Sequence, residues 1–150
     1  MKIISCIWRG VLLDSVGDII SSSFIPPLNS HLYKGQMGRV GIIGGSADYT
    51  GAPYYSGEAA LRFGADLSSI FCALEASLPI KSYSPELMVS PFYSYEDGIR
   101  RSEILFNTEP LLNGLSRMHS YVIGPGLGRD LKVSTEVNCI LQQLVDANKQ

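Results

Sequence analysis

The chain has 150 residues, enough for one domain with a hydrophobic core or for part of a larger domain. Its residues are 45% hydrophobic and 17% charged, and its net charge of −2 argues against nucleic acid as a partner, because a phosphate backbone requires a basic face. The 3 cysteines are odd in number and far apart, which argues against a disulfide framework and against a zinc site.

Residues 1–24 are predicted to be a leader followed by a short helix. The helix has one apolar side from Asp14 onward, and Pro26–Pro27 ends it. Asp14 and Asp18 argue against a mitochondrial presequence, which is normally poor in acidic residues. No apolar run approaches the roughly 20 residues that cross a bilayer, so we expect no membrane partner. We expect a cytoplasmic protein, with a mitochondrial location as the alternative.

Strands and helices are predicted to alternate from residue 39 onward. The apolar runs that end in small residues are typical of strands buried on both faces, and helical spacing marks the segments between them. The expected strands are 39–43, 67–73, 87–90 and 120–123, and the expected helices are 53–63, 75–81, 101–115 and 132–147. This alternation predicts an α/β fold in which helices cover both faces of a parallel sheet.

Several details of these elements are also predicted. The helix over 53–63 is expected to bury a stripe formed by Tyr55, Ala59, Ala60 and Phe63. Pro79 should interrupt the short helix near it, and Pro110 should kink or break the next helix. Residues 93–98 are predicted to form a polar turn. The last helix is amphipathic, so its apolar face needs a sheet, and a further strand would normally follow it.

Two glycine loops are the strongest candidates for a binding site. Gly44–Pro53 and Gly124–Asp130 each follow a predicted strand and each open a helix. In a parallel sheet both loops lie at the carboxyl edge, where open α/β sheets bind ligands. The glycines allow the backbone to approach a ligand, and the helix starts offer N–H groups to an anion. The loops therefore predict a ligand site, for an anionic or nucleotide-like molecule.

Some side chains in these loops have possible binding roles. Tyr49 can stack on a base or a nicotinamide ring, Thr50 can donate a hydrogen bond, and Arg129 can face a phosphate. The alternative for each glycine is ordinary turn chemistry, and Arg129 and Asp130 can equally form a local ion pair or a helix N-cap. Lys81 and Glu86 can serve a substrate or simply belong to a helix-to-strand connection.

The familiar phosphate and nucleophile fingerprints are absent. The chain has no Walker loop and no G-x-S-x-G elbow, and Arg129 stands where a G-x-G-x-x-G pattern would have its last glycine. His31 and His119 are too isolated to indicate a metal site or a triad, so we assign no metal ligand. An NAD-dependent oxidoreductase is therefore disfavoured.

Five segments, in this order, resemble one family, the ATP- or ADP-dependent (S)-NAD(P)H-hydrate dehydratases. They are Lys34–Ser46, Asp48–Tyr54, Gly64–Leu67, Lys81–Val89 and Gly124–Asp130. The resemblance covers residues 25–150, and we interpret this region as the amino-terminal half of such a domain. It implies a ribokinase-like fold, related to carbohydrate kinases, with a three-layer parallel sheet flanked by helices and truncated after about four strands.

The resemblance also implies an activity, which is the return of hydrated NADH or NADPH (NADHX and NADPHX) to NADH or NADPH. ATP or ADP and Mg²⁺ would be the cofactors. The added hydroxyl would be phosphorylated and phosphate then eliminated, because hydroxide is a poor leaving group. Phosphoryl transfer of this kind needs in-line positioning and neutralised charge. The only small-molecule partner implied is the hydrated dinucleotide, and a homo-oligomer is possible.

By position in the matching motifs, the substrate-binding residues implied are Gly126, then Gly124, Gly128, Thr50, Gly51, Ala52 and Tyr49. The family's ATP-binding segments, and the acidic residue that would act as a base on the hydroxyl, would follow Gln150. We therefore expect these 150 residues not to complete the reaction by themselves. The alternative is a non-catalytic nucleotide-binding half-domain or a truncated pseudoenzyme.

Overall fold

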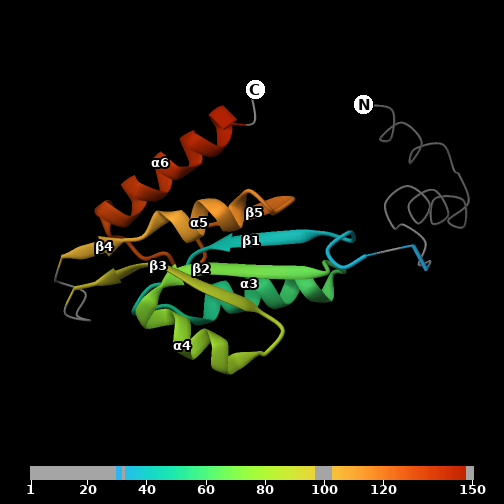
Figure 1. Cartoon of the computed structure of the whole chain (residues 1–150). Coiled ribbons are helices and arrows are strands. Elements are labelled where there is room, and N and C mark those ends of the chain that lie inside the picture. The colour runs from blue at the N-terminus through green and yellow to red at the C-terminus, as the bar shows by residue number, and fades with distance from the viewer. Residues whose placement is uncertain (1–29, 32, 97–102, 148–150) are drawn as a thin grey trace, which may run out of the picture. The chain divides into compact units, whose positions relative to one another are not determined.

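The computed structural model describes residues 30–31, 33–96 and 103–147, and the predicted leader and first helix lie outside them. The chain divides into two compact units, Met1–Tyr33 and Lys34–Gln150. The fold described below is that of the second unit (Figure 1). The domain boundary predicted near residue 25 stays a prediction.

A five-stranded mixed sheet forms the centre of the unit, with the strand order β4-β3-β2-β1-β5. Strands β1, β2, β3 and β5 are parallel, and β4 runs antiparallel to β3 at one edge. The strands are β1 (Arg39–Ile43), β2 (Leu67–Ala73), β3 (Met88–Tyr95), β4 (Ile104–Phe106) and β5 (Ser120–Ile123). The predicted bounds of β1, β2 and β5 are confirmed.

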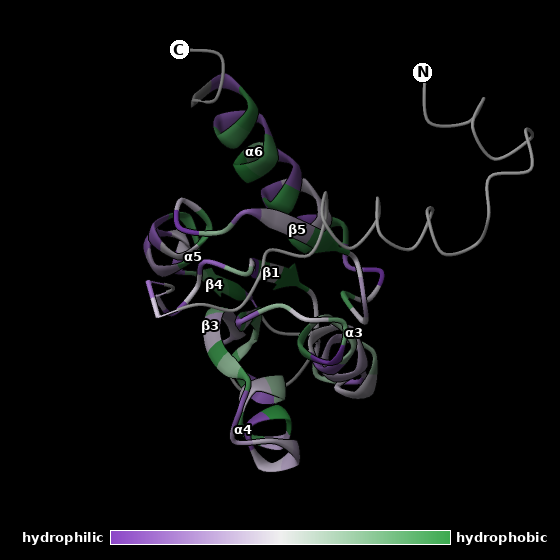
Figure 2. Ribbon diagram, turned by 90° about the vertical axis from the view of Figure 1, so that its right-hand side faces the viewer, coloured by the Kyte–Doolittle hydropathy of each residue, from purple (hydrophilic) through white to green (hydrophobic). Residues whose placement is uncertain are grey.

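Helices cover both faces of this sheet, which gives the three layers expected. They are α3 (Gly51–Arg62), α4 (Leu74–Tyr83), α5 (Thr108–Leu115) and α6 (Leu131–Ala147). Helices α3 and α5 lie on opposite faces (Figures 1 and 2). Apolar residues of β1 and β2 such as Ile42 and Ile70 are fully buried between them, and α6 adds Val137 and Ile140 to the same hydrophobic cluster.

Helix α3 buries a different face from the one predicted. Its fully covered residues are Pro53 and Gly57, whereas Tyr55 is 70% exposed and Phe63 is 98% exposed. A Cβ atom at Gly57 would lie 2.9 Å from Cδ2 of Leu87. The helix therefore packs through small residues that let its backbone come close to the neighbouring chain, and the bulky aromatic side chains point outward.

The prediction of one kinked helix over 101–115 is wrong. Residues 104–106 form β4 instead, paired antiparallel with Tyr93–Tyr95, and α5 begins at Thr108. Pro110 is the third residue of α5, in the first turn, where a missing N–H removes no helical hydrogen bond. It therefore neither kinks nor breaks the helix.

Two other predictions near β3 are also wrong. The expected polar turn at 93–98 is in part β3, because Tyr93 and Tyr95 are buried and continue the strand. Pro79 lies inside α4 without ending it. Ala76 and Ile80, on either side of this proline, are fully buried, so their packing outweighs the lost backbone hydrogen bond.

Candidate functional site

The two glycine loops meet at the carboxyl edge of the sheet, as predicted. Strands β1 and β5 are parallel neighbours, so the loops after them, residues 44–53 and 124–130, leave the sheet side by side. The Gly45 N–H donates to the Pro125 carbonyl at 2.9 Å, and the Gly124 N–H donates to the Ile43 carbonyl at 2.9 Å. These two loops are called the glycine rim below.

Glycine is required at several positions of the rim. Gly45, Gly124, Gly126 and Gly128 have φ angles of +94°, +108°, +63° and +85°, a region that side chains with a Cβ atom rarely adopt. Four glycines with a positive φ in two short segments let the backbone reverse direction, and no side chain extends from these positions.

The two loops also approach each other too closely for larger residues. A Cβ atom at Gly126 would lie 3.0 Å from both Cβ and the carbonyl oxygen of Tyr49, and one at Gly44 would collide with the Pro125 carbonyl oxygen. Gly128 lies against Ser46, whose Oγ would be 3.4 Å from an added Cβ. The rim is therefore a single interlocked surface rather than two independent turns.

The rim leaves backbone donors available. In the loop after β5, the Gly124 N–H donates to the Ile43 carbonyl, and the Leu127 N–H donates to the Gly124 carbonyl at 3.1 Å. The N–H groups of Gly126 and Gly128 have no acceptor in the part of the chain that the structure describes. Two unpaired donors on a rigid surface can bind a carbonyl, hydroxyl or phosphate oxygen.

A buried tyrosine supports the rim from below. The Tyr93 hydroxyl donates to the Gly45 carbonyl at 3.2 Å, and the Ala73 N–H donates to the same oxygen at 3.1 Å. Burial, with smaller contributions from Tyr95 and the neighbouring groups, raises the pKa of Tyr93 above its usual value. Burial also raises the pKa of Cys72 to about 12, so both groups are neutral at physiological pH.

Tyr49, Thr50, Gly51 and Ala52 all lie at the rim. Tyr49 is 53% exposed and closes a tight turn through reciprocal backbone hydrogen bonds with Ser46. Thr50 precedes α3 without a side-chain cap, and its Oγ1 lies 2.9 Å from the Tyr83 hydroxyl. Gly51 and Ala52 form the first turn of α3. The structure thus brings all seven predicted binding residues to one edge.

The start of α6 differs from the expectation of an open anion site. An Asp130 carboxylate oxygen accepts a hydrogen bond from the Lys132 N–H at 2.9 Å, and the Asp130 carbonyl accepts one from the Ser134 N–H at 3.0 Å. Asp130 is therefore an N-cap, one of the alternatives considered, and its negative charge occupies the helix N-terminus. Arg129 is exposed beside it.

Sequence reasoning missed two residues of the site, Tyr93 and Ser46. Tyr93 falls in a segment expected to be a polar turn, so nothing indicated that its hydroxyl reaches Gly45. Ser46 was part of the glycine loop but was given no role. Its side chain is only 6% exposed, and its hydroxyl has no hydrogen-bond partner among the described residues.

Two hollows in the described residues are not lined by the glycine loops themselves, although Tyr93, which bonds to Gly45, lines the first of them. One of about 210 Å³ lies between α4 and strands β3 and β4, and another of about 560 Å³ lies at the amino edge beside Asp66 and Glu86. In residues 30–31, 33–96 and 103–147, no group of three or more His, Cys, Asp or Glu side chains could hold a metal ion. None of the helices described there is long and apolar enough to cross a membrane.

Comparison with solved structures defines the fold class. A ribokinase-like superfamily protein from Enterococcus faecalis superposes with a TM-score of 0.62 at 31% identity, over 78% of this chain and 37% of that one. A Streptococcus mutans protein, SMU.573, gives the same TM-score of 0.62 at 23% identity, over 83% of this chain and 41% of its own. The fold is therefore ribokinase-like.

Sequence comparison defines the family. The family model described as NAD(P)H-hydrate dehydratase matches residues 40–148. The ATP-dependent (S)-NAD(P)H-hydrate dehydratase of Entamoeba histolytica is 48% identical over 126 residues, and that of Rattus norvegicus is 47% identical over 120. The chain belongs to the NAD(P)H-hydrate dehydratase family. It spans 39% of the Entamoeba protein and 32% of the rat protein, so it covers about a third of their length.

Proposed function

We propose that the glycine rim binds the hydrated nicotinamide end of (S)-NADHX or (S)-NADPHX. The observation that carries this proposal is the pair of unpaired N–H groups at Gly126 and Gly128, held on a surface that the loop after β1 locks in place. A hydrated nicotinamide offers a carboxamide oxygen and a hydroxyl oxygen, and both accept hydrogen bonds from backbone N–H groups. Family membership supports this substrate class.

The role proposed for the chain is the substrate-binding part of an ATP-dependent (S)-NAD(P)H-hydrate dehydratase, a lyase that repairs nicotinamide nucleotides. The name of the Entamoeba relative supports ATP as the phosphate donor. ADP in its place, Mg²⁺ and a homo-oligomeric state stay predictions. The described residues form no cluster of His, Cys, Asp or Glu side chains that could hold a metal ion. The cytoplasmic location also stays a prediction.

In this role the residues of the chain bind and orient the substrate. The N–H groups of Gly126 and Gly128 would fix the reduced ring by its oxygens, while the exposed Tyr49 ring would lie against it. Positioning the ring fixes the direction of the added hydroxyl, which a phosphate donor must approach in line. We propose that turnover needs residues beyond these 150, and that this chain by itself binds the substrate with little conversion.

Titration calorimetry tests the proposal directly. The purified chain is expected to bind (S)-NADPHX without ATP and to bind NADPH, which lacks the added hydroxyl, more weakly. Gly126→Ala should weaken binding at least tenfold, because the new Cβ atom would lie 3.0 Å from Tyr49. Equal affinity for the two nucleotides, or no binding of the hydrate, would contradict the proposal.

Gly64→Ala is the matched control for that variant. Gly64 also has a positive φ, +115°, which lies farther from the left-handed α region than the +63° of Gly126, so alanine there carries at least as much backbone strain. It lies at the opposite edge of the sheet, and no atom lies within 4 Å of the position of an added Cβ. Binding by the control should stay within twofold of the unchanged chain. A purely non-catalytic module would show the same binding, and an assay for NADH formation from NADHX in the presence of ATP would reveal any conversion.

A further inference from the structure

Three tyrosine rings form an exposed cluster beside the glycine rim. Tyr54 and Tyr55 lie in the first turns of α3, and Tyr83 is the last residue of α4. The ring centroids of Tyr54 and Tyr55 are 5.2 Å apart, and those of Tyr54 and Tyr83 are also 5.2 Å apart in an edge-on arrangement. We call these three residues the tyrosine cluster.

Much of this aromatic surface faces solvent. Tyr55 is 70% exposed and Tyr83 is 47% exposed, while Tyr54 is partly buried between them. In the edge-to-face pair of Tyr54 and Tyr83 the edge of one ring points at the face of the other, while the Tyr55 ring, which is not part of this pair, is the most exposed ring of the three. Grouped exposed aromatic rings of this kind are typical of binding surfaces, whereas apolar side chains exposed singly are common on any protein.

Direct contacts connect the cluster to the rim. The Thr50 Oγ1 and the Tyr83 hydroxyl form a hydrogen bond of 2.9 Å. A Cβ atom at Gly51 would lie 3.8 Å from Cε2 of Tyr55, so that ring lies against the backbone of the rim. The cluster and the rim therefore form one continuous surface at the start of α3.

We propose that the tyrosine cluster is a stacking subsite for the adenine base of the hydrated dinucleotide, whose nicotinamide end lies at the glycine rim. The inference rests on the function proposed above. A dinucleotide with one ring held at Gly126 can place its second ring on neighbouring surface, and the tyrosine cluster is an exposed aromatic surface that contacts the rim. A purine presents a large π-face, and stacking on an aromatic side chain requires no particular hydrogen-bond pattern.

The test compares two ligands that differ at the adenine end. The first is (S)-NADPHX, and the second is hydrated reduced nicotinamide mononucleotide, which has the same hydrated ring but no adenosine. Tyr55→Leu should weaken binding of the dinucleotide about tenfold, since base stacking on an aromatic ring has roughly this effect. It should leave the affinity for the mononucleotide within twofold.

Phe63→Leu is the matched control, because it also removes an exposed aromatic ring from the same helix region. Phe63 is 98% exposed and is the C-cap of α3, at the end away from the rim. This variant should bind both ligands like the unchanged chain. Tyr83→Phe provides a second test, since it keeps the ring but removes the hydroxyl that bonds to Thr50. Its affinity for the dinucleotide should fall less than threefold.

Each other outcome overturns a defined part of this account. If Tyr55→Leu weakens neither ligand, the stacking subsite is wrong while binding at the rim stands. If it weakens both ligands equally, Tyr55 acts through the shape of the rim and not on the adenine base. If the unchanged chain binds neither ligand, the proposed function fails, and the stacking inference fails with it.

Discussion

The two edges of the sheet use the same unusual backbone conformation for different purposes. At the amino edge, Gly38 and Gly64 have φ angles of +131° and +115°, yet an added Cβ would meet nothing closer than 3.8 Å at Gly38 and nothing within 4 Å at Gly64. At the carboxyl edge, Gly126, with a φ angle of +63°, lies directly against the other loop, and so does Gly44, although its φ is not positive. Gly38 and Gly64 make simple turns, whereas Gly126 and Gly44 let two loops pack together.

This difference shows that a positive φ angle does not by itself indicate a binding site. Turns that precede a strand need the left-handed conformation for chain direction alone. At Gly126 the rim adds a second requirement, which is the close approach of Tyr49 from a distant part of the sequence. A glycine that satisfies both requirements is the better candidate for function.

The largest effect is expected from Gly44→Ala. Its Cβ atom would collide with the Pro125 carbonyl oxygen, which accepts the hydrogen bond from the Gly45 N–H, so the loops must separate. The free energy of unfolding should fall by about 3 kcal/mol, the upper end for overpacking. Urea denaturation followed by circular dichroism measures this change, and binding of (S)-NADPHX should be lost as well.

Gly38→Ala is the control for this first prediction. It carries the strain of a positive φ, which Gly44 does not have, but it has space for the added methyl group, so a smaller loss of about 1–2 kcal/mol is expected. Equal losses in the two variants would mean that the two edges do not differ in the way described.

The second expected effect comes from Tyr93→Phe, which removes the hydroxyl that donates to the Gly45 carbonyl. The carbonyl keeps its hydrogen bond from the Ala73 N–H, so the loss should be about 1 kcal/mol, typical of one neutral hydrogen bond. Chemical denaturation gives this value, and the affinity for (S)-NADPHX should fall with it. Tyr121→Phe is the comparison, since its hydroxyl bonds to the Leu115 carbonyl at 3.0 Å, away from the rim. That variant should leave the affinity unchanged.

A third prediction concerns alkaline pH. Burial raises the pKa of Cys72 from 9.0 to about 12, so the folded chain keeps its thiol proton where the unfolded chain loses it. The contribution of this thiol to stability is complete below pH 9 and decreases as the pH rises toward 12. Between pH 9 and pH 10 the loss from this group should be about 1 kcal/mol.

Denaturation curves at several pH values check this prediction. Tyr93, whose pKa burial also raises, titrates in the same direction, so the comparison must be with Cys72→Ala. That variant should be less stable at pH 8 but should lose less stability as the pH rises. Parallel pH profiles for the two proteins would contradict a buried neutral thiol beneath Gly45.

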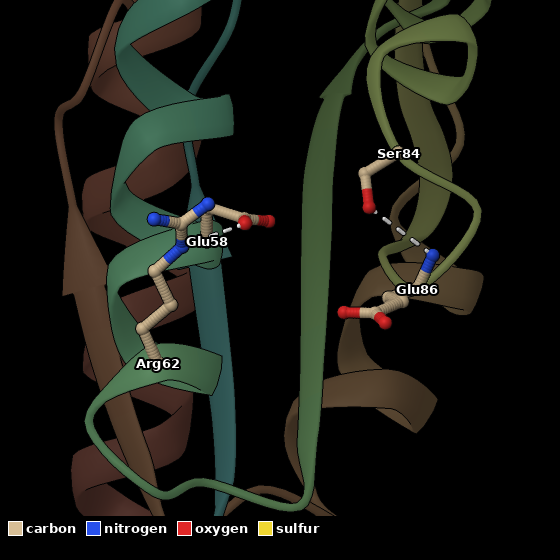
Figure 3. Close-up of polar contacts among 4 residues, drawn as sticks. All are labelled: Glu58, Arg62, Ser84 and Glu86. Carbon is tan, nitrogen blue, oxygen red and sulfur yellow. Dashed lines mark hydrogen bonds and ion pairs between the residues drawn. The ribbon is translucent and has the colours of Figure 1, made fainter.

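The smallest effect is expected from the exposed ion pair on α3. The Arg62 Nε lies 2.9 Å from a Glu58 carboxylate oxygen, and the Arg62 side chain is 79% exposed (Figure 3). An exposed pair four residues apart on a helix contributes about 0.3–0.5 kcal/mol. Arg62→Gln should change the free energy of unfolding by no more than this and should not change ligand binding. Repeating the measurement in 1 M salt should remove the difference.

The strands whose bounds the sequence predicted well are β1, β2 and β5. Apart from Arg39, the residues of β1 and β2 are apolar or small, so their bounds follow directly from the pattern, and β5 follows from an apolar run that ends at Gly124, although its residues are exposed. The convergence of the two glycine loops followed from the rule that parallel strands end at one edge. The seven residues that the family resemblance implies for substrate binding lie in these two loops, and their roles stay predictions.

The parts that failed depend on tertiary contacts. Residues 104–106 have helix-compatible apolar spacing, and only their pairing with β3 makes them a strand. The buried face of α3 contains Gly57, a residue with no hydrophobic signal, because close packing selects for small size there. The hydrogen bond from Tyr93 to Gly45 joins residues 48 positions apart, which no local pattern encodes.

The two outer strands of the sheet differ in how readily a further strand could pair with them. Strand β4 is three residues long and antiparallel, so it makes a short margin, whereas the described part of β5 pairs with β1 alone and exposes Tyr121, Val122 and Ile123 by 37–42%. Any strand that extends the sheet beside β5 in the parallel sense would finish next to Gly124. The side chains that follow such a strand would therefore lie beside the glycine rim.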